Sequence, residues 1–209
     1  MRASGLAVLA AAPVPSASAR TGRTYLPRGI DSAGVPDDDA RMANDRPRTQ
    51  PTMSPEEIER FLGQPLVGIL GWVTARGEAA SSPVWHEYRN GTIRIASSSA
   101  FAKVRAIAKN PAVSFCVQDP EPPYRYVAIR ATAVVHVDPE AAHALDTRLA
   151  VHYLGPAGGR YYTQVIAPTY PGEGRVLELT PRHVSSMDGT AGMDPAVLAA
   201  MRAARAAGA

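Results

Sequence analysis

The fold is decided by residues 78–98, which read EAASSPVWHEYRNGTIRIASS. The pair Asn90-Gly91 is typical of a tight β-hairpin, because both residues tolerate the positive φ that a type I′ turn requires. An apolar run over 66–74 precedes this stretch and is separated from it by a short turn. The pattern therefore predicts an antiparallel meander of three strands, over 66–74, 78–88 and 92–96.

Helix and strand signals continue on both sides of the meander. Ser54, Pro55 and Glu57 predict a helix start with a capping box and proline at the first helical position. Asp138-Pro139 predicts a second start, and Gly155-Pro156 a stop. We expect further helices over 101–109, 138–153, 161–165 and 194–206, and strands over 112–118, 126–137, 175–179 and 183–187. About six antiparallel strands with helices at the ends predict a small barrel.

Composition limits the class of protein. The chain has 209 residues, of which 45% are hydrophobic, so we expect one domain with tails. No apolar run approaches the ~18 residues of a membrane span, and we expect a cytoplasmic protein with no membrane partner. Cys116 is the single cysteine, which excludes an internal disulfide and a cysteine-built zinc site. Its apolar surroundings predict an inert buried thiol.

The net charge of +3 lies outside the middle of the chain. Residues 53–188 hold 13 basic and 13 acidic residues, so this region is neutral. A neutral core argues against a nucleic-acid binder. Only two of the 22 basic residues are lysines and 37 residues are alanine, which favours a GC-rich, actinobacterial genome.

The chain is predicted to divide into a disordered tail over 1–52, a core domain over 53–188 and a C-terminal tail over 189–209 that can form a helix. The proline-rich first segment lacks sustained periodicity. It begins with a weak apolar run followed by Ala17-Ser18-Ala19, which is similar to an export signal. We prefer a tail or an upstream start codon, with Met53 as a natural start, and expect the segment to be dispensable for folding.

One constellation has the chemistry of an anion site. Hydroxyl residues Ser97 and Ser98 end a strand, and Lys103 follows in the first turn of a predicted helix. Five basic residues and no acid occupy 89–109. Helix amides, the helix dipole and a lysine would together hold a phosphate. The alternative is a solvated basic helix face. Pro83 favours a strand that is not fully paired, against which a flat ligand can lie.

The order of these segments resembles the split β-barrel flavin and deazaflavin oxidoreductases, the pyridoxamine-5′-phosphate-oxidase-like superfamily. The similar stretches are MSPEEIERFL, VGILGWVTARGEAASSPVWHEY, GTIRIASSSAFAKVRAIAKNPAVSFCVQD, PPYRYVAIRATAVVHVD and RVLELTPRHVSSMDG. The resemblance is strongest to members that use the deazaflavin F420. It implies a mainly β fold with α, a six-stranded antiparallel split β-barrel with peripheral helices.

The resemblance also implies a homodimer with the cofactor in a groove between subunits. Phe101 stands where relatives have arginine, and Met187 where they often have tryptophan. Residues 153–175 are expected to rim the site. Arg105, from the basic run, is added to the residues that the resemblance implies. The predicted cofactor-binding residues are then Ser82, Pro83, Val84, Trp85, Ile95, Ala96, Ser97, Ser98, Lys103, Arg105, Gln118, Tyr124 and Arg125.

The predicted function is hydride transfer from reduced F420 to a small organic acceptor. In such enzymes the cofactor performs the redox chemistry and the protein binds and shields it. Two alternatives stay open, an FMN-dependent enzyme on the same fold and a non-catalytic F420- or flavin-binding protein. The dispersed histidines predict no metal site, and no catalytic side chain is assigned.

Overall fold

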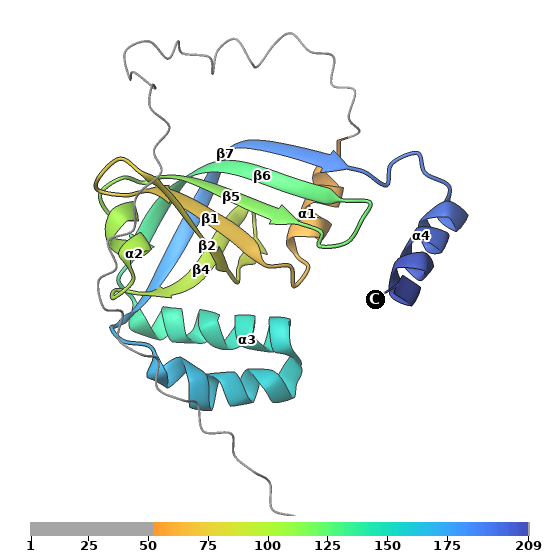
Figure 1. The fold of residues 1–209 in the computed structure, drawn as a ribbon. Coiled ribbons are helices and arrows are strands. Elements are labelled where there is room, and N and C mark those ends of the chain that lie inside the picture. The colour runs from red at the N-terminus through yellow and green to blue at the C-terminus, as the bar shows by residue number, and fades with distance from the viewer. Residues whose placement is uncertain (1–51, 209) are drawn as a thin grey trace, which may run out of the picture. The chain divides into compact units, whose positions relative to one another are not determined.

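A computed structural model describes residues 52–208 of the chain (Figure 1). The predictions made for residues 1–51 lie outside this range. The elements in chain order are α1 (Pro55–Leu62), β1 (Gly68–Val73), β2 (Ala79–Val84), β3 (Glu87–Arg89), β4 (Thr92–Ser98), α2 (Ala102–Ile107), β5 (Ala112–Gln118), β6 (Arg125–His136), α3 (Pro139–Tyr161), η1 (Tyr162–Ile166), η2 (Ala167–Thr169), β7 (Gly174–Asp188) and α4 (Pro195–Gly208).

The strands of the described region form one antiparallel sheet in the order β2-β1-β5-β6-β7-β4-β3. Its edge strands β2 and β3 are separated in the chain by only Trp85 and His86. A two-residue connection between opposite edges requires the sheet to curl until these edges approach each other. The prediction of six strands was wrong: within residues 52–208 the sheet has seven strands and is not closed.

The seventh strand arises because the predicted strand over 78–88 breaks at His86. The imidazole of His86 is buried, and its Nε2 lies 3.0 Å from the carbonyl oxygen of Leu62. It also packs edge-on against the Phe115 ring, with ring centroids 5.0 Å apart. These contacts turn the chain out of β2 and start β3 on the other edge of the sheet.

The two predicted terminal strand segments join into the single long strand β7. The pairing of β6 with β7 shifts register between Arg130 and Ala131, because Arg130 pairs with His183 while Ala131 pairs with Pro181. Pro181 has no N–H to donate, so a bulge at this point keeps the strand continuous while its pairing shifts.

The main core fills the inside of the curled sheet. Strand β4 alternates, with Ile93 and Ile95 fully buried in this core and Ala96 on the opposite face. A second cluster forms where α3 packs over β7 and β4, from the side chains Ala142, Leu145, Leu149 and Val176. The two faces of β4 are therefore both covered, and its C-terminal end lies between the core and α3.

The local signals of the sequence are confirmed at three turns and caps. Ser54 caps α1 by accepting from the Glu57 amide at 3.3 Å, and the Glu57 carboxylate accepts from the Ser54 amide at 2.7 Å. Asn90 and Gly91 both have positive φ, 51° and 76°. Asp138 caps α3 through the Ala141 amide at 2.9 Å.

Helix α3 doubles back on itself at the predicted stop. Gly155 has φ 73° and ψ 172°, a conformation open to glycine alone. After Pro156 the chain is helical again and continues into η1, and the predicted helix over 161–165 covers the last residue of α3 and most of η1. Figure 1 shows the two helical arms side by side along the sheet. We call this segment, residues 139–166, the α3 hairpin.

The C-terminal helix α4 lies in the tail where the sequence predicts a helix, and its described side chains are exposed or half-buried. No helix within residues 52–208 combines the length and the apolar character that a membrane crossing needs.

Candidate functional site

A cavity of about 650 Å³ lies between the curled sheet and the α3 hairpin. This volume is in the usual range for small-molecule sites. The ends of β2 and β4, the start of α2 and the segment after the α3 hairpin complete its walls. Its lining residues are Val67, Pro83, Val84, Trp85, Ala96, Ser97, Ser98, Phe101, Lys103, Pro139, Ala142, His143, Asp146, Leu149, Tyr162, Thr163, Ala167, Pro168, Tyr170, Gly172 and Gly174.

The fold brings two of the predicted stretches together at this cavity. The lining includes Pro83, Val84 and Trp85 from β2 and its end, and Ala96, Ser97, Ser98 and Lys103 from β4 and α2. Ser82 touches the same site, because its Oγ lies 3.4 Å from the Lys103 ammonium. These segments meet because the curled sheet brings the end of β2 close to β4.

Other predicted residues lie elsewhere. The Ile95 side chain is fully buried in the main core. Arg105 is exposed and donates to the carbonyl oxygens of Ser99 and Ala100. Arg125 pairs with Asp119 at 2.8 Å and lies over the Phe61 ring. The predicted residues outside the cavity lining are Ser82, Ile95, Arg105, Gln118, Tyr124 and Arg125.

The basic run over 89–109 does not gather at one place. Arg94 forms an ion pair with Glu178 at 3.6 Å, while Arg89 and Lys109 are exposed. Within the run, Lys103 alone lines the cavity. The anion site predicted from five basic residues therefore reduces to one lysine.

Lys103 reaches from α2 toward the free edge of β2. Its side chain is half-buried, and its ammonium lies 5.2 Å from the centre of the Phe101 ring. Burial lowers the pKa of Lys103 below its usual value. Within residues 52–208 its ammonium has no carboxylate partner, and its neighbour is the neutral Ser82 hydroxyl. A desolvated cation of this kind favours an anionic ligand.

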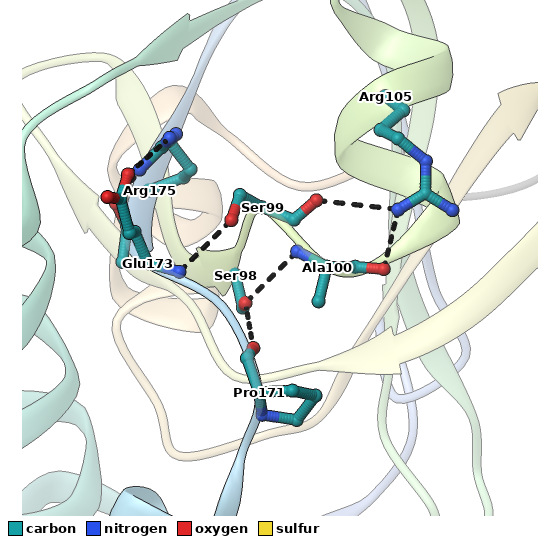
Figure 2. Close-up of polar contacts among 8 residues, drawn as sticks. Ser98, Ser99, Ala100, Arg105, Pro171, Glu173 and Arg175 are labelled. Carbon is teal, nitrogen blue, oxygen red and sulfur yellow. Dashed lines mark hydrogen bonds and ion pairs between the residues drawn. The ribbon is translucent and has the colours of Figure 1, made fainter.

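The serine turn, Ser98-Ser99-Ala100, is held by the segment Pro171–Glu173 (Figure 2). The Ser98 hydroxyl donates to the Pro171 carbonyl oxygen and accepts from the Ala100 amide. The Ser99 hydroxyl accepts from the Glu173 amide at 3.0 Å. The Ser98 hydroxyl therefore both donates and accepts within the chain, whereas the Ser99 hydroxyl only accepts there and does not line the cavity.

Gly172 permits this docking. Its φ is +85°, and a Cβ there would lie 2.7 Å from the Ser98 Oγ and 2.9 Å from the Ala100 amide nitrogen. A residue with a side chain would be strained at this positive φ, and its Cβ would clash with the serine turn.

Ser97 is different from its two neighbours. Its Oγ is buried and has no hydrogen-bond partner in the described structure. A buried hydroxyl without a partner loses its hydration without compensation. Ser97 belongs to the cavity wall beside Ala96 and Ser98, although its Oγ itself is buried.

Aromatic rings form much of the cavity wall. Trp85 stacks on Tyr153, with centroids 5.1 Å apart and planes at 16°, and contacts Tyr162 at 5.0 Å. Phe101 meets Tyr170 edge-to-face at 6.1 Å. A wall of this kind suits a flat conjugated ligand.

Tyr153 and His86 position Trp85. The Tyr153 hydroxyl lies 2.9 Å from the Leu66 carbonyl oxygen and 3.0 Å from the His86 Nδ1. Burial lowers the pKa of His86 to about 4, so its imidazole is neutral at neutral pH. Tyr153 and His86 therefore support the aromatic wall from behind and do not line the cavity.

Sequence reasoning missed Asp146, which lines the cavity from the α3 hairpin, while Tyr162 and Tyr170 line it from within residues 153–175, the range expected to rim the site. A signal for Asp146 was present. It lies on the helix face of Ala142 and Leu149, so an acid interrupts an apolar stripe. Burial raises the pKa of Asp146, and burial together with Asp146 and Tyr170 raises the pKa of Tyr162.

Residues 54–188 match the protein family described as pyridoxamine 5′-phosphate oxidase. No curated protein matches the chain.

Solved structures match as well. A conserved hypothetical protein from Mycobacterium tuberculosis is 22% identical with a TM-score of 0.58, covering 69% of this chain and 90% of that one. A protein described as a 5-nitroimidazole antibiotic resistance protein from Bacteroides thetaiotaomicron is 13% identical with a TM-score of 0.50, covering 66% and 86%. A protein described as an F420 reductase is 27% identical with a TM-score of 0.49, covering 61% and 94%. The first two likenesses support the fold.

Proposed function

Because the chain belongs to the pyridoxamine 5′-phosphate oxidase family, whose wider superfamily binds flavins and, in some members, F420, we propose that it is an oxidoreductase. In this proposal the cavity binds the deazaflavin F420, and hydride passes from the reduced cofactor to a small organic acceptor. The preference for F420 rests on the sequence stretches that resemble F420-dependent members.

One observation carries the proposal: Lys103 is a half-buried cation that lines the cavity and has no carboxylate partner in residues 52–208. A cofactor phosphate would supply the missing negative charge. The Ser82 hydroxyl lies beside the ammonium, 3.4 Å away. Lys103 and Ser82 fit a phosphate better than Ser98, whose hydroxyl donates and accepts within the chain, or Ser99, which does not line the cavity.

The ring system of the cofactor fits the other part of the cavity. Strand β2 is a sheet edge, so within residues 52–208 one side of its backbone has no neighbouring strand. Pro83 removes one N–H from this strand, and Trp85 begins the aromatic wall. A flat heterocycle can hydrogen-bond along the free backbone edge and pack against the rings.

The residues present indicate a role for each part of the site. The bound cofactor would supply the hydride chemistry. Lys103 and Ser82 would hold its phosphate, the end of β2 would orient its rings, and the α3 hairpin would exclude water from the cavity. No side chain of the described region is needed as a nucleophile in this scheme.

A homodimer is also proposed, supported by the outer face of the sheet. Ile69 is 44% exposed there, and its cross-strand neighbours are Cys116 and then Ala128. These side chains make a flat apolar row that a second copy can cover. A shallow hollow of about 850 Å³ follows on the same face, beside Gly71 and Ser114.

We further propose a cytoplasmic location, where reduced cofactor would be available.

Turnover with reduced F420 tests the proposed activity. The full chain is mixed with reduced F420 and a panel of enones, quinones and tetrapyrroles, and the return of the oxidised cofactor's absorbance is followed. The proposal expects catalytic oxidation of F420 with at least one acceptor. Tight F420 binding without turnover on any acceptor would instead favour a binding protein, and turnover with FMN alone would favour an FMN enzyme.

A further inference from the structure

Asp146 is a carboxylate that lines the cavity and has no hydrogen-bond or ion-pair partner among residues 52–208. It lies on the inner side of the α3 hairpin and is half-buried. Within residues 52–208 it makes no hydrogen bond or ion pair, although His143 lies one turn earlier on α3. Burial raises the pKa of Asp146 and the charge of His143 opposes that rise. A desolvated carboxylate that faces an open cavity is stabilised by a cation or a strong hydrogen-bond donor.

The surroundings of Asp146 favour a cation. Tyr162 is close enough for the Asp146 charge to raise the pKa of its hydroxyl. The ring of Tyr162 contacts Trp85, and Tyr170 lies close enough to raise the same pKa. Faces of tryptophan and tyrosine rings attract positively charged nitrogen, and the attraction grows when water is excluded. A carboxylate beside such rings is a common arrangement for binding ammonium groups.

The cavity therefore carries opposite charges in two places. Lys103 extends from α2 and Asp146 from α3, and no ion pair joins them. A cofactor phosphate would be attracted by Lys103 and repelled by Asp146. Binding of the phosphate at Lys103 leaves the part of the cavity around Asp146, Tyr162 and Trp85 to the second ligand.

We propose that Asp146 and the rings of Trp85, Tyr162 and Tyr170 form a substrate subsite for an organic compound that carries a positively charged nitrogen. The identification of this ligand as the hydride acceptor rests on the proposed function. The subsite itself rests on the position of Asp146 and the rings in the cavity.

Three matched compounds test the subsite with the full chain. 4-Phenylbutylamine, 4-phenylbutanol and 4-phenylbutyrate share a ring and a linker and differ in charge. Calorimetric titration at pH 7.5 is expected to show the amine binding about tenfold more tightly than the alcohol, and the carboxylate more weakly than both. This comparison needs no variant, so it does not depend on whether a mutant folds.

Asp146→Asn is expected to remove the preference for the amine. Glu140→Gln is the matched control, because Glu140 lies on the same helix, is exposed and does not line the cavity. It should retain the preference. A Trp72→Phe background leaves Trp85 as the single tryptophan, and the amine should then quench its fluorescence.

F420 and FMN titrations of the same proteins separate this inference from the proposed function. Loss of amine preference with intact cofactor binding in Asp146→Asn supports both. Amine preference without any cofactor binding would retain the subsite and reject the proposed function. Equal affinity for amine and alcohol in the unmodified protein, or an amine preference that survives in Asp146→Asn, would overturn the subsite.

Discussion

Lys103 is the residue on which the proposed cofactor site depends most. Lys103→Ala is expected to weaken cofactor binding by about 1–3 kcal/mol, the range for a charged hydrogen bond. Lys109→Ala is the matched control, because Lys109 is the other lysine of the chain and is exposed outside the cavity. Fluorescence titration of both variants with F420 and FMN measures the difference. Equal affinities in the two variants would remove Lys103 from the site.

His86 couples the stability of the fold to pH. Its pKa is about 4 in the folded protein and near 6.5 when exposed, so below pH 6.5 the unfolded chain binds a proton that the folded chain does not. Stability from this residue is complete above pH 6.5 and is lost as the pH falls toward 4, by about 3 kcal/mol in total.

Urea unfolding of the protein and of His86→Gln at several pH values between 4 and 7.5 tests this linkage. The variant should be less stable at neutral pH and should show a shallower loss of stability with acid. His183→Gln, at an exposed position, should follow the unmodified protein. An unchanged slope in His86→Gln would show that His86 is not the titrating group.

At the scale of the elements, the serine turn and the segment Pro171–Glu173 form one unit. Gly172→Ala places a Cβ 2.7 Å from the Ser98 Oγ at a φ of +85°, so it combines strain with a clash. Gly77→Ala is the control, because Gly77 has φ +80° with nothing within 4 Å. Thermal and urea unfolding should show a loss of roughly 1 kcal/mol in the control and clearly more in Gly172→Ala. Equal losses would mean that the turn and the segment are not packed as described.

Local signals and long-range contacts differ in how well the sequence predicts them. The Ser54–Glu57 capping box and the Asn90-Gly91 turn involve neighbours in the chain, and both were predicted correctly. The break at His86 depends on Tyr153, 67 residues away, and the serine turn depends on Pro171, 73 residues away. No local pattern contains such partners, so the extra strand and the occupied serine hydroxyls were not predicted.

In the cavity, too, contacts between segments that are close in the chain were predicted better than contacts between distant ones. Strand β2, strand β4 and Lys103 were predicted to meet because they are close in the chain and match one family pattern. The Asp146–Tyr162 side depends on how the α3 hairpin folds back at Gly155 and packs on the sheet. The family resemblance implied that residues 153–175 rim the site, and Asp146 in an apolar stripe was the local signal for the rest of this side.

At the scale of the whole molecule, the proposed dimer has a direct test. Light scattering of the full chain should give about 44 kDa, twice the 22.1 kDa of one chain. Ile69→Lys places a charge on the exposed apolar row and should shift the protein toward monomer. Val137→Lys is the control, since Val137 is 71% exposed and follows β6 outside that row. A monomeric unmodified protein, or a dimer unaffected by Ile69→Lys, would contradict this interface.

A side-by-side titration of the full chain with F420 and FMN tests the central claim most directly. Binding is followed by quenching of tryptophan fluorescence, since Trp85 stands in the cavity wall. The account predicts saturable binding of F420, one per chain, tighter than that of FMN and weakened in Lys103→Ala. Tighter binding of FMN would reject F420 as the cofactor. Absence of saturable binding by either cofactor would contradict the claim that this cavity is a flavin-like cofactor site.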